Sequence, residues 1–209
     1  NARDAGRQPA AMYAMGSLLL AKDDLAGAVK MAEDGLSKYP QSLPVQTLSL
    51  NTITTLLDKN RVEDAERLIS KYPGTSPGLV FQQGALAFRK GDYPLAQSLF
   101  REAARRASEK TAESALFNEN LAALNANDAA GAAALVKEAA GSAQLREHIL
   151  FEQAHYAAKR MNPQAPELLA SFVALATDPA LKTQARLDQA EVALNLNPPD
   201  LETVQAILP

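Results

Sequence analysis

Residues 79–104 read LVFQQGALAFRKGDYPLAQSLFREAA, and this stretch decides the fold class of the 209-residue chain. Two runs of periodic apolar residues flank a Lys-Gly-Asp tripeptide at positions 90–92. Spacings of three and four residues place the apolar positions of each run on one face of a helix. These positions are Val80, Gly84 and Ala87 in the first run, and Ala96, Phe100 and Ala103 in the second. The stretch therefore predicts two helices joined by a tight turn.

The same pattern recurs along the chain, and such a unit buries its apolar face only against its neighbours. Corresponding positions in the first unit are Met12, Gly16, Leu19, Ala28, Ala32 and Gly35, and those in the fourth are Leu116, Asn120, Ala132, Val136 and Ala139. We predict a single domain, 1–209, with repeats near residues 9–41, 42–76, 77–112, 113–146 and 147–178, followed by terminal helices in 179–209.

These positions resemble the tetratricopeptide (TPR) repeat motif. That motif has a large apolar residue followed four positions later by a small one, an aromatic residue near the turn, and an Ala-Phe-Ala series in the second helix. Residues 79–104 carry these features at Val80, Gly84, Tyr93, Ala96, Phe100 and Ala103. The resemblance implies an all-α fold of antiparallel helix pairs, stacked as a right-handed superhelical solenoid. It also implies a concave groove lined by the first helix of each pair.

About twelve helices are expected, and capping residues support their ends. Ser76 precedes Pro77, which is the usual order at a helix start. Asp92, Asp128 and Asp178 each precede an apolar-periodic run that they can cap, and Asp200 does the same. The predicted helices lie near residues 9–22, 25–38, 44–58, 62–71, 77–90, 93–107, 110–125, 129–140, 143–160, 165–176, 179–196 and 200–208.

Composition excludes several classes of function. The chain has no Cys, which rules out disulfides, zinc–cysteine sites and thiol nucleophiles. A formal net charge of −3 argues against nucleic-acid binding, which needs a net basic face. No apolar run approaches the roughly 18 residues of a membrane span. His148 and His155 share a helix face with Glu152, but their spacing is not that of a zinc protease. We therefore predict no catalytic residues, no metal and no cofactor.

One row of residues is the candidate binding site. Each member stands one position after the first large apolar residue of its repeat, at spacings of 33, 35, 36 and 34: Tyr13, Gln46, Phe81, Phe117 and Phe151. In the TPR family this position faces the groove, and rigid aromatic rings suit a binding surface. Packing of the rings in the core is the alternative, since an apolar stripe on a helix is usually buried. Arg89 is a further candidate contact for a partner.

The leading functional prediction is a non-catalytic scaffold that binds a partner peptide or domain in the groove. The next row along the groove lacks the basic residues with which some TPR proteins grip a terminal carboxylate: Ser17, Leu50, Ala85, Leu121 and His155. The Ala-rich style resembles repeat arrays of bacterial envelope assembly and export machines, which implies a periplasmic or envelope location, with the cytoplasm as the alternative. The chain is expected to be a fragment. An accessory region of a larger enzyme and a self-assembling array with weak self-association are the alternative functions.

Overall fold

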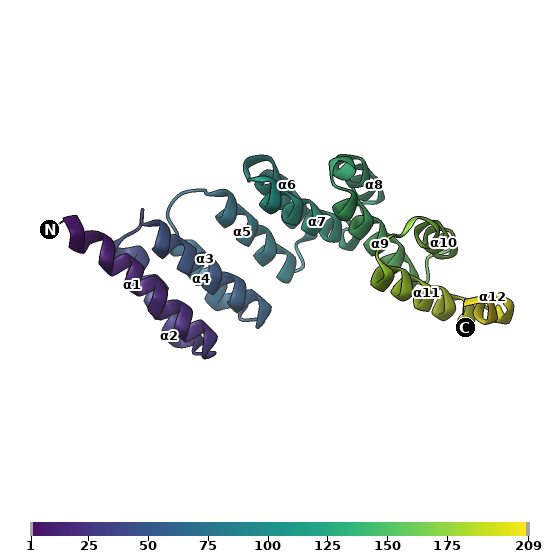
Figure 1. Ribbon diagram of the computed structural model, residues 1–209, viewed down its shortest axis with the longest axis horizontal. Coiled ribbons are helices and arrows are strands. Elements are labelled where there is room, and N and C mark those ends of the chain that lie inside the picture. Colours follow the sequence, from purple (N-terminus) through teal and green to yellow (C-terminus); the bar gives the residue numbers. More distant parts are fainter. Residues whose placement is uncertain (1, 208–209) are drawn as a thin grey trace. The chain divides into compact units, whose positions relative to one another are not determined.

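The computed structural model describes residues 2–207, which form helices throughout and no strand (Figure 1). This confirms the predicted all-α fold class. The helices are α1 (Ala2–Ala21), α2 (Leu25–Lys38), α3 (Leu43–Asp58), α4 (Val62–Lys71), α5 (Pro77–Arg89), α6 (Tyr93–Arg106), α7 (Glu109–Asn125), α8 (Ala129–Glu138), the 3₁₀ helix η1 (Ala139–Gly141), α9 (Ala143–Lys159), α10 (Ala165–Leu175), α11 (Pro179–Leu194) and α12 (Leu201–Ile207).

The first helix is longer than predicted. It begins at Ala2 and passes through Pro9, whereas the sequence predicted a start near residue 9. Proline favours the first turn because it lacks an N–H group, so a helix is expected to begin there. The preceding residues include Ala2 and Ala5, whose high helix propensity favours an earlier start. The first helix therefore extends beyond its predicted start.

One turn geometry joins the helices of a pair at five places in the described chain. Each turn has a single residue of left-handed backbone, with φ between 51° and 78°: Asp23, Asn60, Gly91, Asn127 and Met161. The next residue donates its backbone N–H to a carbonyl oxygen five positions earlier, at 2.7–3.0 Å. This is the Schellman motif, which satisfies the last carbonyls of a helix. The repeat is thus visible in the backbone itself.

The residue after the left-handed one often caps the second helix. Asp24, Asp92 and Asp128 accept a hydrogen bond from the backbone N–H three positions later. The predicted caps at Ser76, Asp178 and Asp200 do so as well, while Ser142 is a cap that the sequence analysis did not predict. Three residues separate the two helices at the first four of these turns, whereas five, residues 160–164, separate α9 from α10.

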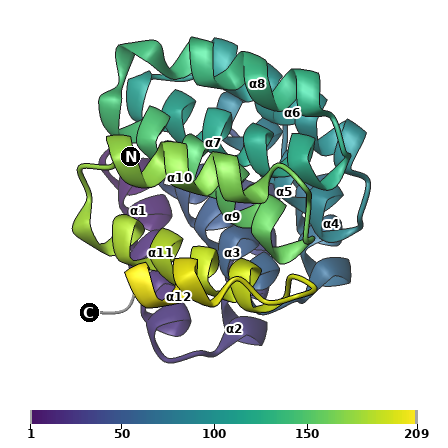
Figure 2. The same cartoon turned by 90° about the vertical axis from the view of Figure 1, so that its right-hand side faces the viewer.

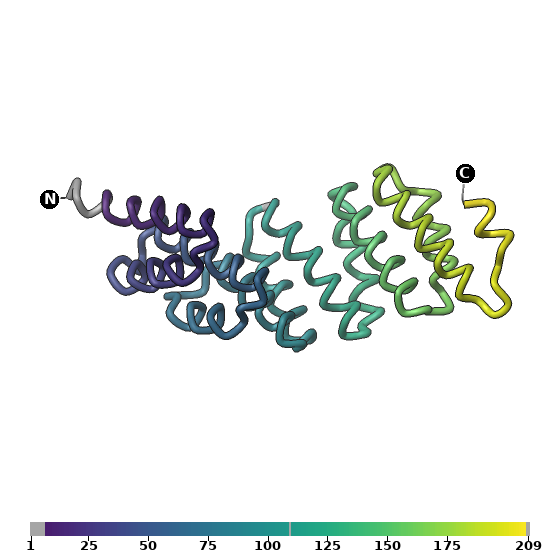
Figure 3. Tube along the Cα trace, turned by 90° about the horizontal axis from the view of Figure 1, so that it is seen from below, coloured from purple at the N-terminus to yellow at the C-terminus, as the bar shows by residue number. Residues whose placement is uncertain are grey.

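The chain divides into two compact units, residues 1–115 and 116–209. In the first unit, α1 packs on α2 and α3, α3 packs on α4 and α5, and α5 packs on α6. Its core contains Val45, Leu48, Ile53, Leu56 and Leu68. In the second unit α9 packs on α8, α10 and α11, and α10 also packs on α11 (Figure 2, Figure 3). The helix-pair packing fits a solenoid, while a single continuous domain and a right-handed superhelix stay predictions.

Small residues allow close packing, as the repeat pattern predicted. A Cβ atom added to Gly84 would lie 2.9 Å from the ring of Phe100, which is buried on α6. A Cβ atom added to Gly16 would lie 2.4 Å from the side chain of Leu48, which belongs to the next repeat. Contacts this short are not tolerated in a packed core. A side chain at either position would therefore force Phe100 or Leu48 to move.

Candidate functional site

The candidate site in the first unit is the surface formed by α1, α3 and α5, which lie side by side (Figure 1). Tyr13 on α1 is 37% exposed and makes no aromatic contact among the described residues. Gln46 on α3 is half-buried and donates from Nε2 to the carbonyl oxygen of Pro40 at 2.8 Å. Phe81 on α5 is half-buried and meets the ring of Phe100 edge-on at 5.3 Å. Tyr13 has the most surface available to a partner.

Arg89 ends α5 and is exposed, as a partner-contacting residue would be. Its guanidinium lies 3.9 Å from the carboxylate of Asp58, which is also exposed. An exposed pair at this distance is weak, on the order of 0–1 kcal/mol. The arginine therefore remains able to contact a second carboxylate.

The rest of the predicted row belongs to the second unit and is more enclosed. Phe117 on α7 is half-buried, with its ring 6.4 Å from that of His148. Phe151 on α9 is only 8% exposed, between the rings of His155 and Phe172 at 5.5 Å each. The alternative interpretation, packing in the core, therefore describes Phe151 better than a groove position does.

His155 holds a buried carboxylate that the sequence did not reveal. Its Nδ1 lies 2.6 Å from Oδ2 of Asp188 on α11, which is 1% exposed. Gln184 donates to the other carboxylate oxygen at 3.1 Å, and Lys159 lies 3.9 Å from it. A buried carboxylate needs such partners. His155 and Asp188 are 33 positions apart, which is about one repeat. The repeat period was therefore the only signal in the sequence that could have paired them.

Two carboxylates on α9 have pKa values shifted in opposite directions. Hydrogen bonds donated by the Thr177 hydroxyl and by the backbone N–H groups of Thr177 and Asp178 lower the pKa of Glu147. Burial raises the pKa of Glu152, against the opposing effect of the nearby histidines. Glu147 thereby fixes the start of α11, whereas Glu152 is kept partly away from solvent.

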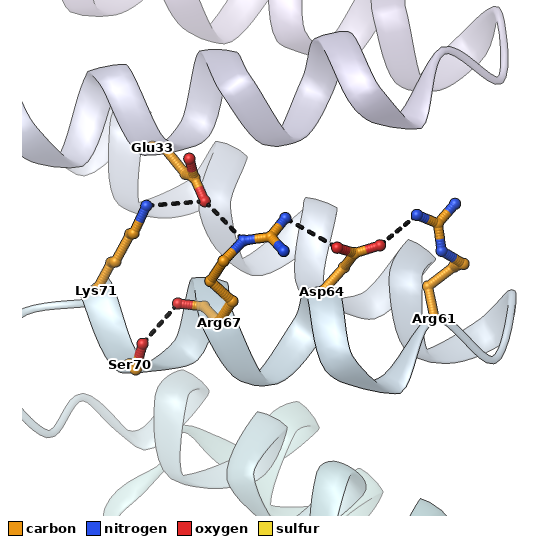
Figure 4. Close-up of polar contacts among 6 residues, drawn as sticks. All are labelled: Glu33, Arg61, Asp64, Arg67, Ser70 and Lys71. Atoms are coloured by element: carbon orange, nitrogen blue, oxygen red, sulfur yellow. Dashed lines mark hydrogen bonds and ion pairs between the residues drawn. The ribbon is translucent and has the colours of Figure 1, made fainter.

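A charge network joins α2 to α4 on the second-helix side of the first unit (Figure 4). Glu33 contacts Arg67 at 3.3 Å and Lys71 at 3.0 Å, and Arg67 also contacts Asp64 at 2.8 Å. Asp64 pairs in turn with Arg61. Burial alone would raise the pKa of Glu33, but the two cations outweigh it and lower that pKa. The charged groups of the network pair with one another, and they line a cavity of about 250 Å³.

The second unit has a larger cavity on its second-helix side, of about 380 Å³. Residues of α8, α9 and α10 line it, with the end of α7 and the turns between them. The sequence pattern did not predict this cavity, because the cavity depends on the distance between two helices. The Ala-rich composition of α8 was the available signal.

No protein-family model matches the chain, and no curated protein matches it.

Among the side chains that the structure describes, those of residues 7–108 and 110–207, three or more His, Asp or Glu residues do not gather to hold a metal ion. His155 is oriented by the buried carboxylate of Asp188, as a general base can be. Over the same residues, every helix is too short or too polar to cross a bilayer.

Proposed function

We propose that this chain is a non-catalytic scaffold that binds a partner peptide or domain on the surface of its first helices. The observation that supports this proposal is the exposed ring of Tyr13 on α1, beside α3 and α5. A tyrosine gives a large contact area at a small cost in side-chain entropy. The resemblance to arrays of bacterial envelope assembly and export machines makes the cell envelope the first place to seek the partner.

Tyr13 offers the sharpest test because it is 37% exposed, whereas Phe81 packs on buried Phe100. A phage-displayed library of random peptides would be selected on the immobilised chain, and the affinity of the selected peptide measured by calorimetry. We expect Tyr13→Ala to weaken binding by about tenfold, the usual effect of losing a central aromatic contact. Helical circular dichroism should stay unchanged.

Leu95→Ala is the matched control, because Leu95 is a large exposed apolar residue on α6, a second helix of the same unit. It should leave the affinity unchanged. Equal losses in the two variants, or a library that yields no specific peptide, would contradict binding on the first-helix surface.

Self-association is a second candidate function, favoured by a different face of α1. Met15 and Leu18 are 50% and 48% exposed and lie three positions apart, so they share one side of the helix. An uncovered apolar stripe on a helix is a common contact between proteins. A second copy of the chain is one partner that would cover it.

A further inference from the structure

The cavity of the second unit has the size and lining of a ligand site. Its volume of about 380 Å³ falls within the range of small-molecule and peptide pockets. Ala132, Ala133 and Leu168 supply apolar walls, while Gln153, Arg160 and Asn162 bring polar groups to it. It involves the second helices α8 and α10, so it is separate from the first-helix surface of the proposed function.

The cavity follows from the sequence of α8, which reads AAGAAALVKE over residues 129–138. The side chains that this helix turns toward the cavity are alanines, which are too short to fill the space beside α10. The start of α8 is fixed, since Asp128 accepts a hydrogen bond from the backbone N–H of Gly131 at 2.8 Å. The helix therefore holds its position and leaves the space open.

The polar groups of the cavity are held in place by neutral partners. Gln153 donates from Nε2 to Oδ1 of Asn120 at 2.9 Å and to the carbonyl oxygen of Ala132 at 2.8 Å. Arg160 donates to Oδ1 of Asn127 at 3.1 Å, and its guanidinium lies 4.5 Å from the centre of the Tyr156 ring. Among the described contacts, no carboxylate pairs with Arg160. The cavity thus presents the positive charge of Arg160, while the lining carboxylate of Asp128 accepts the capping hydrogen bond from Gly131.

We propose that this cavity binds an extended peptide segment that carries a carboxylate side chain two positions from a large aliphatic side chain. The carboxylate pairs with Arg160, whose planar group suits two parallel hydrogen bonds. The aliphatic side chain fills the space along Ala133 and Leu168. Both hydrogens on Nε2 of Gln153 are already donated, so its Oε1 is the atom that can accept a hydrogen bond from a peptide N–H. The Nδ2 of Asn162 can donate to a peptide carbonyl oxygen.

The spacing of two positions follows from the geometry of an extended chain. Successive side chains point to opposite faces, so only residues two apart enter the same cavity. The probes are capped tetrapeptides with Leu-Ala-Glu or Glu-Ala-Leu at their centre, each closed by one further alanine. The composition-matched control has Leu and Glu adjacent, as acetyl-Ala-Leu-Glu-Ala-amide, which sends the two side chains to opposite faces.

The test is an NMR titration of the ¹⁵N-labelled 209-residue chain. Shifts are expected at the backbone amides of Asp128–Ala133 and of Gln164, Ala165, Glu167 and Leu168, with at least one spaced probe binding about tenfold more tightly than the adjacent control. Arg160→Gln should weaken this binding by about tenfold, the usual effect of losing a hydrogen bond to a charged group. Arg186→Gln, which removes the same charge from α11, should not.

Filling the cavity tests its location. Ala133 and Ala134 are both exposed on α8, but only Ala133 lines the cavity. Ala133→Phe should abolish the titration, while Ala134→Phe should leave it intact. If the Ala133→Phe variant melts at a lower temperature than the Ala134→Phe variant, the smaller substitution Ala133→Leu is used in the titration instead of Ala133→Phe. The proposal would be overturned if the Ala133 and Ala134 variants bound the probe equally well. It would also be overturned if the adjacent and spaced probes bound equally, or if acetate alone produced the same shifts.

Discussion

At the scale of single residues, the neighbouring side chain restricts which residue type fits at a packed position. Gly84 meets a buried ring, and Gly16 meets Leu48 of the next repeat. The sequence pattern predicted small residues at these positions because helices that pack closely need them. It could not predict that His155 would hold Asp188, since that pair forms only when α9 and α11 lie together. Pairings between repeats depend on the packed structure.

Glu147 and Glu152 should affect stability with opposite signs. A carboxylate with a lowered pKa stabilises the folded state above its unfolded pKa, near 4.5, and loses that contribution as pH falls through the folded value. Glu147→Gln should therefore destabilise the protein at pH 7. The raised pKa of Glu152 has the opposite effect. The free energy of unfolding falls as pH rises from about 4.5 through the pKa of Glu152 in the folded state. Glu152→Gln should stabilise at pH 7.

Urea unfolding of the two variants at pH 7 and at pH 3.5 would measure both effects. Each difference from the wild type should shrink at the lower pH, because the carboxyl groups that cause it become protonated. The two positions lie on one helix, so each variant serves as the control for the other. Shifts of the same sign at pH 7 would refute this account of the two environments.

At the scale of elements, the sequence determined nearly every helix and its ends. The bounds of α2 and α4 agree with those predicted, and the other predicted helices are present with small differences at their ends, apart from the earlier start of α1. Periodicity and capping residues are local signals, so they were enough for this purpose. The candidate site was less predictable. The burial of Phe151, for example, depends on Phe172 and on α10.

The left-handed turn makes a prediction about Gly91, whose φ is 78°. Gly91→Ala should destabilise the protein by about 1 kcal/mol, because a side chain disfavours this backbone region. Nothing lies within 4 Å of the added Cβ atom, so the cost comes from the backbone alone. Thermal unfolding followed by circular dichroism would measure it.

Gly141→Ala is the matched control, because its added Cβ atom also meets nothing and its φ lies outside the left-handed range. That substitution should be neutral or slightly stabilising, since alanine lowers the entropy of the unfolded chain. If both variants lost the same stability, the cost could not be assigned to the left-handed turn.

At the scale of the whole molecule, a stack of helix pairs has apolar faces on its end helices, because a pair packs mainly against its neighbours in sequence. Self-association through Met15 and Leu18 can be tested by sedimentation velocity over a range of concentrations. Leu18→Glu should remove any concentration-dependent increase in mass, because a charge on an apolar interface opposes its burial. Leu95→Glu is the control, as both leucines are 48% exposed. A wild-type chain that stays monomeric throughout would exclude this function.

The single-residue turn also determines where the chain tolerates a change of length. The left-handed residues are 37, 31, 36 and 34 positions apart, yet the turn geometry stays the same at all five. Differences in repeat length are therefore absorbed by the helices and by the connections between pairs. An affinity tag or a protease site should be accepted in the segment 73–75, between α4 and α5. The same insertion beside Asn60 would move Arg61 and separate α4 from α3.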